Sequence, residues 1–217
     1  MSLKPKHILG LKVVIHIGQL FSFTWLVFAV INGHLGADPV QPIIHFTGKA
    51  ALNTLLITLL VSPVAKRFKQ GQLIRTRRLL GLYSFAWAVI HLTAFAWLDL
   101  ALEWQLIGSE IVKRPYLVLG AIVWVILLLL AITSTQAIQR RMGKKWQQLH
   151  NWVYIAAILA PIHYYWSVKS EILEPGIYIG CALILLWIRK DKIQRWINMS
   201  TANKSSPPNT RSKHKTS

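Results

Sequence analysis

The sequence predicts an all-α polytopic membrane protein, a bundle of six transmembrane helices with both termini in the cytoplasm. Hydrophobic residues make up 53% of the 217 residues and charged residues only 15%, and several apolar runs approach the roughly 20 residues that a bilayer-spanning helix needs. Basic residues gather between alternate runs, as expected of loops that stay in the cytoplasm. The net charge of +18 therefore indicates orientation rather than nucleic-acid binding.

The first half of the chain supplies three of the expected spans, at residues 8–31, 44–65 and 79–98. The loop at 32–39 is rich in turn-forming residues and has no Lys or Arg, which suits the outer side. The segment 66–78 carries six basic residues and no acidic one. It therefore indicates a cytoplasmic loop.

The second half supplies the other three spans, at residues 116–136, 149–166 and 177–188. The proline of Arg114-Pro115 suits the first turn of the fourth span, where its missing N–H costs nothing. The sixth span has only twelve uninterrupted apolar residues. Tilt, and snorkelling of Arg189 and Lys190 toward the surface, would make up its length.

The distribution of charge supports this topology. Twenty of the 25 basic residues lie in the segments assigned to the cytoplasm, and six of the seven acidic residues lie in those assigned to the outside. We expect one membrane domain over residues 1–199, followed by a disordered basic cytoplasmic tail at 200–217, because that tail is polar and has no apolar periodicity. We find no internal repeat.

Two histidines lie at similar depth in the expected bundle. His91 is about 18 Å from the cytoplasmic edge of the third span and His163 about 21 Å from that of the fifth, at 1.5 Å per residue. An ionisable side chain within a membrane indicates function by default, and a neutral imidazole is a common axial ligand of haem iron. We predict that the two histidines bind one haem in the outer half of the bilayer. The alternative is that both form hydrogen bonds between helices.

Three other histidines are weaker candidates. His150 lies at the inner edge, where it either binds a second, inner haem or forms hydrogen bonds at the interface. A straight helix turns by about 220° over the 13 residues from His150 to His163, so a bend would be needed for both to share a face, and Pro161 is a candidate for it. His16 is the only plausible intramembrane partner of His150. His45 lies almost at the outer surface.

Other kinds of site find little support. A single cysteine, Cys181, excludes a disulfide framework and covalently attached c-type haem, so any haem must be non-covalent. There is no glycine-rich nucleotide motif and no zinc-binding spacing. The outer loops are too short to build a soluble catalytic pocket. Electrons that leave through the outer face would therefore need a separate protein to receive them.

Several stretches together carry a family resemblance. They are Gly36-Ala37-Asp38-Pro39, His45-Phe46-Thr47-Gly48, Arg75-Thr76-Arg77-Arg78-Leu79-Leu80-Gly81, Arg114-Pro115-Tyr116, Thr133-Ser134-Thr135-Gln136, Leu149-His150-Asn151 and Pro161-Ile162-His163-Tyr164. They resemble the MsrQ (YedZ) family, the haem-binding membrane subunits of bacterial periplasmic methionine sulfoxide reductase systems. More distantly, residues 1–199 look like the transmembrane haem domain of ferric reductases and NADPH oxidases.

The resemblance implies cofactors, partners and site residues. It implies one or two groups of haem b, and FMN, with His91, His163 and His150 as the haem-binding histidines. It also implies a bacterial inner-membrane location and electron transfer from quinol, or from a cytosolic flavin reductase, to the periplasmic molybdopterin subunit MsrP. The chain itself would need no substrate site. The alternatives are a quinol-linked or ferric-reductase-type cytochrome with another acceptor, and a haem-free membrane anchor or transporter.

Overall fold

The computed structural model describes residues 4–168 and 172–205, and every regular element in these ranges is helical. Two short elements flank α3: the 3-10 helix η1 (Gly71–Thr76) precedes it and the π-helical turn η2 (Phe95–Asp99) follows it. The α-helices are α1 (Pro5–Ile31), α2 (Val40–Arg67), α3 (Arg77–Ala94), α4 (Trp104–Lys113), α5 (Pro115–Ile132), α6 (Gln136–Met142), α7 (Lys144–His150), α8 (Val153–Ser167), α9 (Leu173–Trp187) and α10 (Lys190–Ser205).

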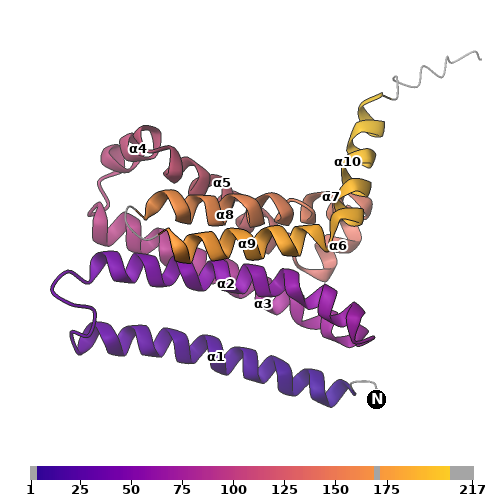
Figure 1. Ribbon diagram of the computed structural model, residues 1–217, viewed down its shortest axis with the longest axis horizontal. Coiled ribbons are helices and arrows are strands. Elements are labelled where there is room, and N and C mark those ends of the chain that lie inside the picture. The colour runs from indigo at the N-terminus through magenta and orange to yellow at the C-terminus, as the bar shows by residue number, and fades with distance from the viewer. Residues whose placement is uncertain (1–3, 169–171, 206–217) are drawn as a thin grey trace, which may run out of the picture.

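Four helical segments of the described chain are long and apolar enough to cross a membrane: α1, α2, η1 with α3 and η2, and α5. The chain is therefore a multi-pass membrane protein. Helices α8 and α9 have 15 residues each, or about 22 Å at 1.5 Å per residue. They run alongside the long helices (Figure 1) but fall short of the usual spanning length.

The centre of the bundle is formed by α2, α3, α5 and α8. One buried apolar cluster draws on all four of these helices, with Leu55, Ala88, Val123, Ile126, Leu127 and Ala156. A second cluster joins α2 and α8 to α9 through Leu52, Leu56, Leu59, Tyr154, Ala157, Ala182, Leu185 and Leu186. Small alanines on α8, fully buried in both clusters, let the neighbouring helices approach closely, as is common between membrane helices.

Helix α1 lies beside this bundle with a visible separation along much of its length (Figure 1). Two polar contacts tie it to α3. His16 Nδ1 lies 2.5 Å from the hydroxyl oxygen of Tyr83, and Trp87 Nε1 donates to Gln19 Oε1 at 2.6 Å. Other α1 side chains are exposed, Phe21 at 69%, which suits contact with lipid.

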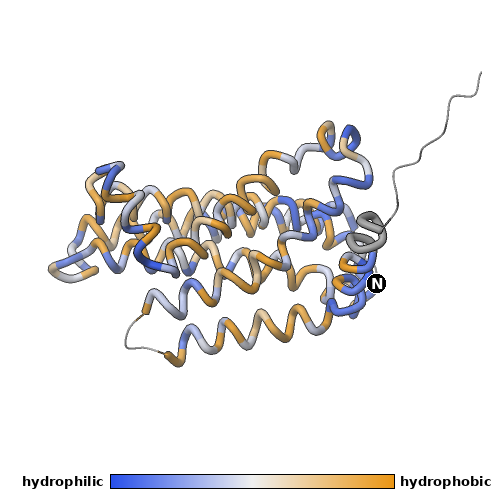
Figure 2. The backbone as a smooth tube through the Cα atoms, turned by 90° about the horizontal axis from the view of Figure 1, so that it is seen from above, coloured by the Kyte–Doolittle hydropathy of each residue, from blue (hydrophilic) through white to orange (hydrophobic). Residues whose placement is uncertain are grey.

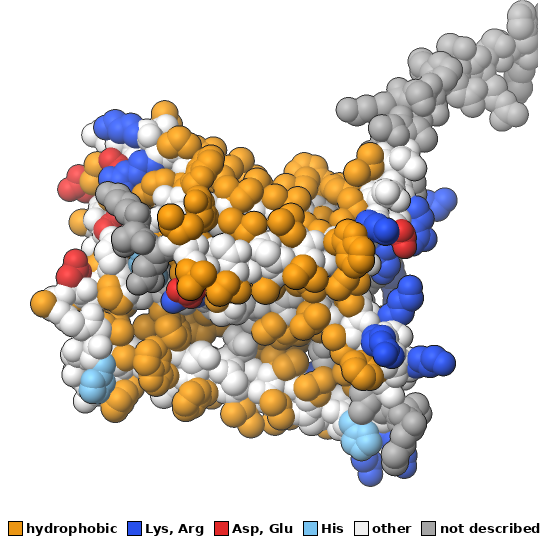
Figure 3. All heavy atoms as spheres, in the orientation of Figure 1, with side chains coloured by type: hydrophobic (Ala, Val, Ile, Leu, Met, Phe, Trp, Pro, Cys, Tyr) orange, Lys and Arg blue, Asp and Glu red, His pale blue; other side chains and the backbone are white. Residues whose placement is uncertain are grey.

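The surface divides by polarity along the bundle. Apolar segments run through the middle and polar ones gather toward the ends (Figure 2). Most of the visible Lys and Arg side chains lie at the end that holds α10 and the N-terminus, and most of the visible Asp and Glu side chains lie at the opposite end (Figure 3). We call these the basic end and the acidic end.

Some boundaries differ from the sequence-based expectation. The fourth span was expected to reach Gln136, but α5 ends at Ile132 and Thr135 caps the separate helix α6 by accepting a hydrogen bond from the Ile138 backbone. Helix α10 continues through Ser205, so the first six residues of the tail expected to be disordered are helical. Residues 206–217 lie outside the described part.

Candidate functional site

Near the acidic end of the bundle, the structure brings His91 of α3 and His163 of α8 together. Their ring centres lie 6.2 Å apart and their planes make an angle of 79°. A metal–imidazole bond is about 2.0 Å long, and the ring centre lies about 1.1 Å beyond the nitrogen. Two axial ligands of one iron would therefore have their ring centres roughly 6 Å apart, which the observed spacing matches.

Both histidines are oriented by backbone carbonyl groups. Nδ1 of His91 donates to the carbonyl oxygen of Ile44 at 3.0 Å, and Nδ1 of His163 donates to that of Tyr116 at 2.7 Å. A carbonyl can only accept, so the proton of each neutral ring is on Nδ1 and the lone pair is on Nε2. A hydrogen bond from the second ring nitrogen to a carbonyl is typical of histidines that bind a metal. The donor set therefore fits an iron between the two rings.

Each imidazole also lies against a glycine of a neighbouring helix. A Cβ built on Gly48 of α2 would lie 3.1 Å from His91 Cε1, and one built on Gly120 of α5 would lie 2.8 Å from His163 Cε1. Real Cβ atoms essentially never approach other atoms to less than 3.0 Å. The rings thus occupy space that exists because both positions lack a side chain.

The two halves of this arrangement repeat along the chain. Ile44 and Tyr116, whose carbonyls accept these hydrogen bonds, each precede their histidine by 47 positions. Gly48 follows Ile44 by four positions, and Gly120 follows Tyr116 by four. Sequence identities at the same offset of 72 residues include Leu55 with Leu127, Gly71 with Gly143, Ala88 with Ala160 and Ile90 with Ile162. The expectation of no internal repeat was therefore wrong: α2–α3 and α5–α8 are equivalent hairpins that each supply one histidine.

His150 lies at the basic end, on α7. Its ring stacks on Trp146 with centres 3.9 Å apart, and its Nε2 lies 3.1 Å from the hydroxyl of Thr133. The ring is half-buried, and Arg77 lines the same cavity as His150. Helices α7 and α8 are separated at residues 151–152, so the helix is interrupted well before Pro161, the candidate for a bend.

The structure gives His150 no imidazole partner from α1. The internal repeat instead relates His150 to Arg78, and both line the same cavity. His16, the partner considered from the sequence, is hydrogen-bonded to Tyr83 and does not line it. The structure thus pairs His91 with His163 and leaves His150 apart.

That cavity has a volume of about 670 Å³ and lies at the basic end, where α2, α3, α5 and α8 meet α6, α7 and α10. Volumes of about 300–1,000 Å³ are typical of ligand and cofactor sites. Five basic residues line it, and no lining residue in the described chain is acidic; they are Arg77, Arg78, Arg189, Lys192 and Arg195. We call it the inner cavity.

The position of Arg189 differs from the sequence-based prediction. It was expected to snorkel to the surface from the last span, but it is only 5% exposed. Its Nη2 donates to the carbonyl oxygen of Leu59, and its Nη1 lies 3.5 Å from the Tyr154 hydroxyl. One signal was present in the sequence: Pro63 follows Leu59 by four positions and leaves that carbonyl without its helical donor.

His45 lies beside the central pair rather than in it. Its ring centre is 6.4 Å from that of Tyr164, whose hydroxyl donates to Glu174 at 3.0 Å. Lys49 forms an ion pair with the same carboxylate at 3.2 Å. This group links α2 and α8 to Glu174 of α9.

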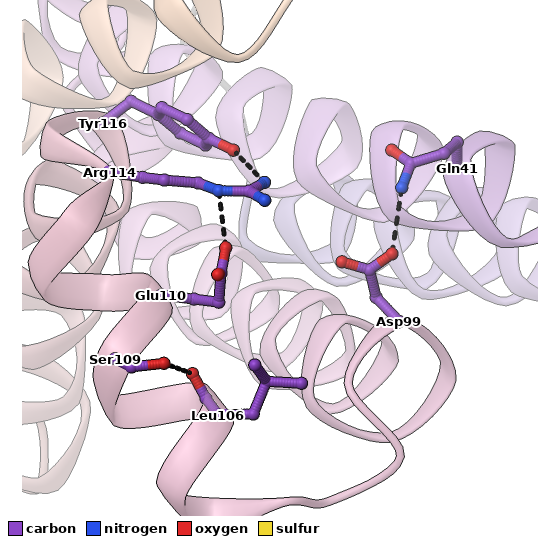
Figure 4. Close-up of polar contacts among 7 residues, drawn as sticks. All are labelled: Gln41, Asp99, Leu106, Ser109, Glu110, Arg114 and Tyr116. Carbon is purple, nitrogen blue, oxygen red and sulfur yellow. Dashed lines mark hydrogen bonds and ion pairs between the residues drawn. The ribbon is translucent and has the colours of Figure 1, made fainter.

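At the acidic end, Arg114 joins α4 to α5. Its side chain extends between the carboxylate of Glu110, at 2.6 Å, and the hydroxyl of Tyr116, at 3.2 Å (Figure 4). Tyr116 also accepts the His163 hydrogen bond through its backbone. In the same view, Gln41 donates to Asp99, so η2 is attached to α2.

Comparison with known protein families places part of the chain in a family. The family model described as "Ferric reductase like transmembrane component" matches residues 47–161, which is more than half of the chain. The matched range holds His91 and His150 but ends just before His163. No solved structure matches the chain.

Proposed function

The chain belongs to the family of ferric reductase like transmembrane components, a membership that indicates a membrane electron-transfer role, and on that premise we propose that it is a b-type cytochrome carrying electrons outward. The observation that carries the proposal is the central histidine pair. Its rings have the spacing of two ligands of one iron, and both keep Nε2 free of the proton. Haem bound there would supply reversible one-electron carriage.

The chain's own residues would hold the haem and fix its properties. His91 and His163 would donate from Nε2, and the carbonyls of Ile44 and Tyr116 would keep both rings in the required tautomer. These hydrogen bonds also make the imidazoles better donors, which influences the reduction potential. Held from both sides by His91 and His163, the haem would supply electron carriage and no substrate site.

We further propose that the inner cavity holds a second carrier. His150 lines it with a half-buried ring, so this residue would be either a ligand of a second haem or a contact of bound FMN. The stacked Trp146 offers a planar surface beside it. A carrier here would bridge the inner half of the membrane, which the central pair leaves empty.

The resemblance to MsrQ suggests the remaining parts of the pathway. We propose six spans with both termini in the cytoplasm of a bacterial inner membrane, α8 and α9 being the short ones. Electrons would come from quinol or a cytosolic flavin reductase and pass to the periplasmic molybdopterin subunit MsrP, in support of the repair of oxidised proteins. The gathering of basic side chains at one end supports this orientation.

The family description favours one alternative, a ferric-reductase-type or quinol-linked cytochrome with another acceptor. A haem-free anchor or transporter belongs to a different class. The visible absorption spectrum of protein purified from haem-supplemented cells tests the proposal. We expect a Soret band with α and β bands that sharpen on reduction. Protein without a haem spectrum, after reconstitution with haem as well, would refute a cytochrome of either kind.

Once haem is found, the preferred electron acceptor distinguishes the proposed function from the ferric-reductase-type alternative. We expect the dithionite-reduced protein to be reoxidised by MsrP much faster than by ferric citrate in stopped-flow mixing. Faster oxidation by ferric citrate would favour the ferric-reductase alternative.

A further inference from the structure

We propose that Arg189 anchors an oxyanion site in the inner cavity, that Pro63 positions it, and that the site binds the phosphate or carboxylate groups of a planar redox cofactor. The inference rests on the proposed function only in assigning the anion to a redox carrier. The anion site itself follows from charge and geometry where α2 and α8 meet the turn between α9 and α10.

Pro63 creates the acceptor that fixes Arg189. Proline has no N–H, so within a helix it leaves the carbonyl four residues earlier without its donor. In α2 that carbonyl belongs to Leu59, which is fully buried. Arg189 Nη2 donates to it from the end of α9. The proline thus holds the guanidinium at the cavity wall.

The neutral partners of Arg189 leave its charge uncompensated. Leu59 offers a carbonyl, Tyr154 offers a hydroxyl and a ring face 5.9 Å from the guanidinium carbon, and Nε has no partner in the described chain. Burial of an unpaired charge is costly. An anion in the cavity would remove most of this cost.

Neighbouring cations point to the same conclusion. The Nε atom of Arg77 is buried and also without a partner in the described chain. Burial, followed by the charges of Arg189 and Arg77, lowers the pKa of Lys192, so these groups repel one another. Ionisable side chains within a membrane protein indicate a functional site by default, and an anion would offset the repulsion among these cations.

The side chains also indicate which anion fits. Guanidinium groups bind phosphate and carboxylate oxygens in a two-pronged geometry. Trp146 and Tyr154 line the same cavity and offer flat faces to a ring. The shared chemistry is therefore a planar ring that carries phosphate, as FMN does, or carboxylates, as haem does.

The test uses full-length protein in nanodiscs and four variants. Arg189→Met removes the charge, and Arg189→Lys keeps it without the two-pronged geometry. Pro63→Ala restores a backbone N–H that competes with Arg189 for the Leu59 carbonyl oxygen. Arg67→Met is the matched control, because Arg67 is an exposed arginine at the same end that does not line the cavity. FMN binding is measured by fluorescence quenching, and haem by titration followed by pyridine haemochrome quantification.

We expect Arg189→Met to weaken binding of FMN, or of the second haem equivalent, by at least tenfold. Arg189→Lys and Pro63→Ala should weaken it about three- to tenfold, and Arg67→Met should leave it unchanged. Loss of FMN alone would assign the site to phosphate, and loss of one haem alone would assign it to propionates.

Wild-type affinity for both cofactors in Arg189→Met and Pro63→Ala would overturn the proposal, as would a loss confined to co-purifying anionic lipid. The spectrum of the His91–His163 haem reports folding in each variant. If Arg189→Met does not fold, Arg189→Lys and Pro63→Ala decide the outcome. A wild-type protein that binds FMN through Arg189 but never binds haem would refute the cytochrome and leave the anion site standing.

Discussion

Gly48 and Gly120 occupy equivalent positions, each against the imidazole of one histidine of the central pair. A Cβ would approach His91 to 3.1 Å at Gly48 and His163 to 2.8 Å at Gly120. Both contacts lie one helical turn beyond the carbonyl that receives the same histidine's Nδ1 proton. The same local arrangement, present in both halves of the internal repeat, thus sets the position and the tautomer of each ring.

The first prediction concerns these glycines. Gly120→Ala should displace His163 and lower low-spin haem content severalfold, because the added methyl meets the ring itself and overpacking of this kind costs about 1–3 kcal/mol. Gly48→Ala should have a weaker effect of the same kind. Haem content and the EPR g-values of the purified variants measure both.

Gly180→Ala is the control for the glycine variants. A Cβ at Gly180 of α9 would have no atom within 4 Å, and Gly180 does not line the inner cavity, so haem binding should not change. A Gly120→Ala protein with the haem content and EPR spectrum of the wild type would contradict the role given to the glycine.

The second prediction concerns the histidines themselves. His91→Ala and His163→Ala each remove one axial nitrogen, and His45, the nearest other histidine, is held beside Tyr164 and Lys49 at the edge of the site. Each variant should lose the low-spin signal or become high-spin, as seen by optical and EPR spectroscopy. Retention of a bis-histidine spectrum in both would refute the assignment.

The third prediction separates the inner site from the central pair. His150→Ala should leave the low-spin haem of His91 and His163 intact, because His150 lies on α7 at the basic end and contacts Trp146 and Thr133 instead. We expect loss of part of the haem or of FMN, measured by cofactor stoichiometry. Complete loss of haem in folded protein would show that His150 serves the central site.

The sequence could predict the central pair because depth along a helix follows from residue counting. His91 and His163 lie at similar depth on helices expected to rise from the same side, and the structure brings them within 6.2 Å. The glycines could not be predicted this way, since their role depends on which helix faces which. The repeat that links them was hidden because only scattered positions are identical.

The inner cavity was harder to predict for a different physical reason. An arginine that follows an apolar run resembles a snorkelling side chain, and the inward turn of Arg189 depends on the Leu59 carbonyl of a distant helix. The length of the fourth span was also mispredicted. Thr133 ends α5 and Thr135 begins α6, whereas hydropathy alone suggested a longer helix.

The fourth prediction tests orientation. A reporter active only in the periplasm should work when fused after Gly36 or Glu110 and fail after Gly71, Gly143 or Ser205, because Lys- and Arg-rich loops resist translocation. Alkaline phosphatase activity, normalised to the amount of fusion protein, provides the measurement. Activity after Gly143 would reverse the proposed direction of electron flow.

The fifth prediction is that this chain alone does not reduce methionine sulfoxide. Residue counting puts the central pair about 18–21 Å from the inner edge of a hydrocarbon core about 30 Å thick, so an electron could leave at the outer surface. The side chain of an oxidised protein could not reach an iron that lies between His91 and His163, with Gly48 and Gly120 against their rings. Both axial positions would be filled as well.

We therefore expect dithionite-reduced protein, mixed in a stopped-flow instrument, to be reoxidised rapidly by the molybdopterin subunit and negligibly by free methionine sulfoxide. A high-spin His163→Ala protein is the informative comparison, because an opened coordination position should admit small ligands such as imidazole or carbon monoxide that the wild type excludes. Turnover of methionine sulfoxide by the isolated wild-type chain would show that a substrate reaches the iron, and the division of labour between two subunits would then be wrong.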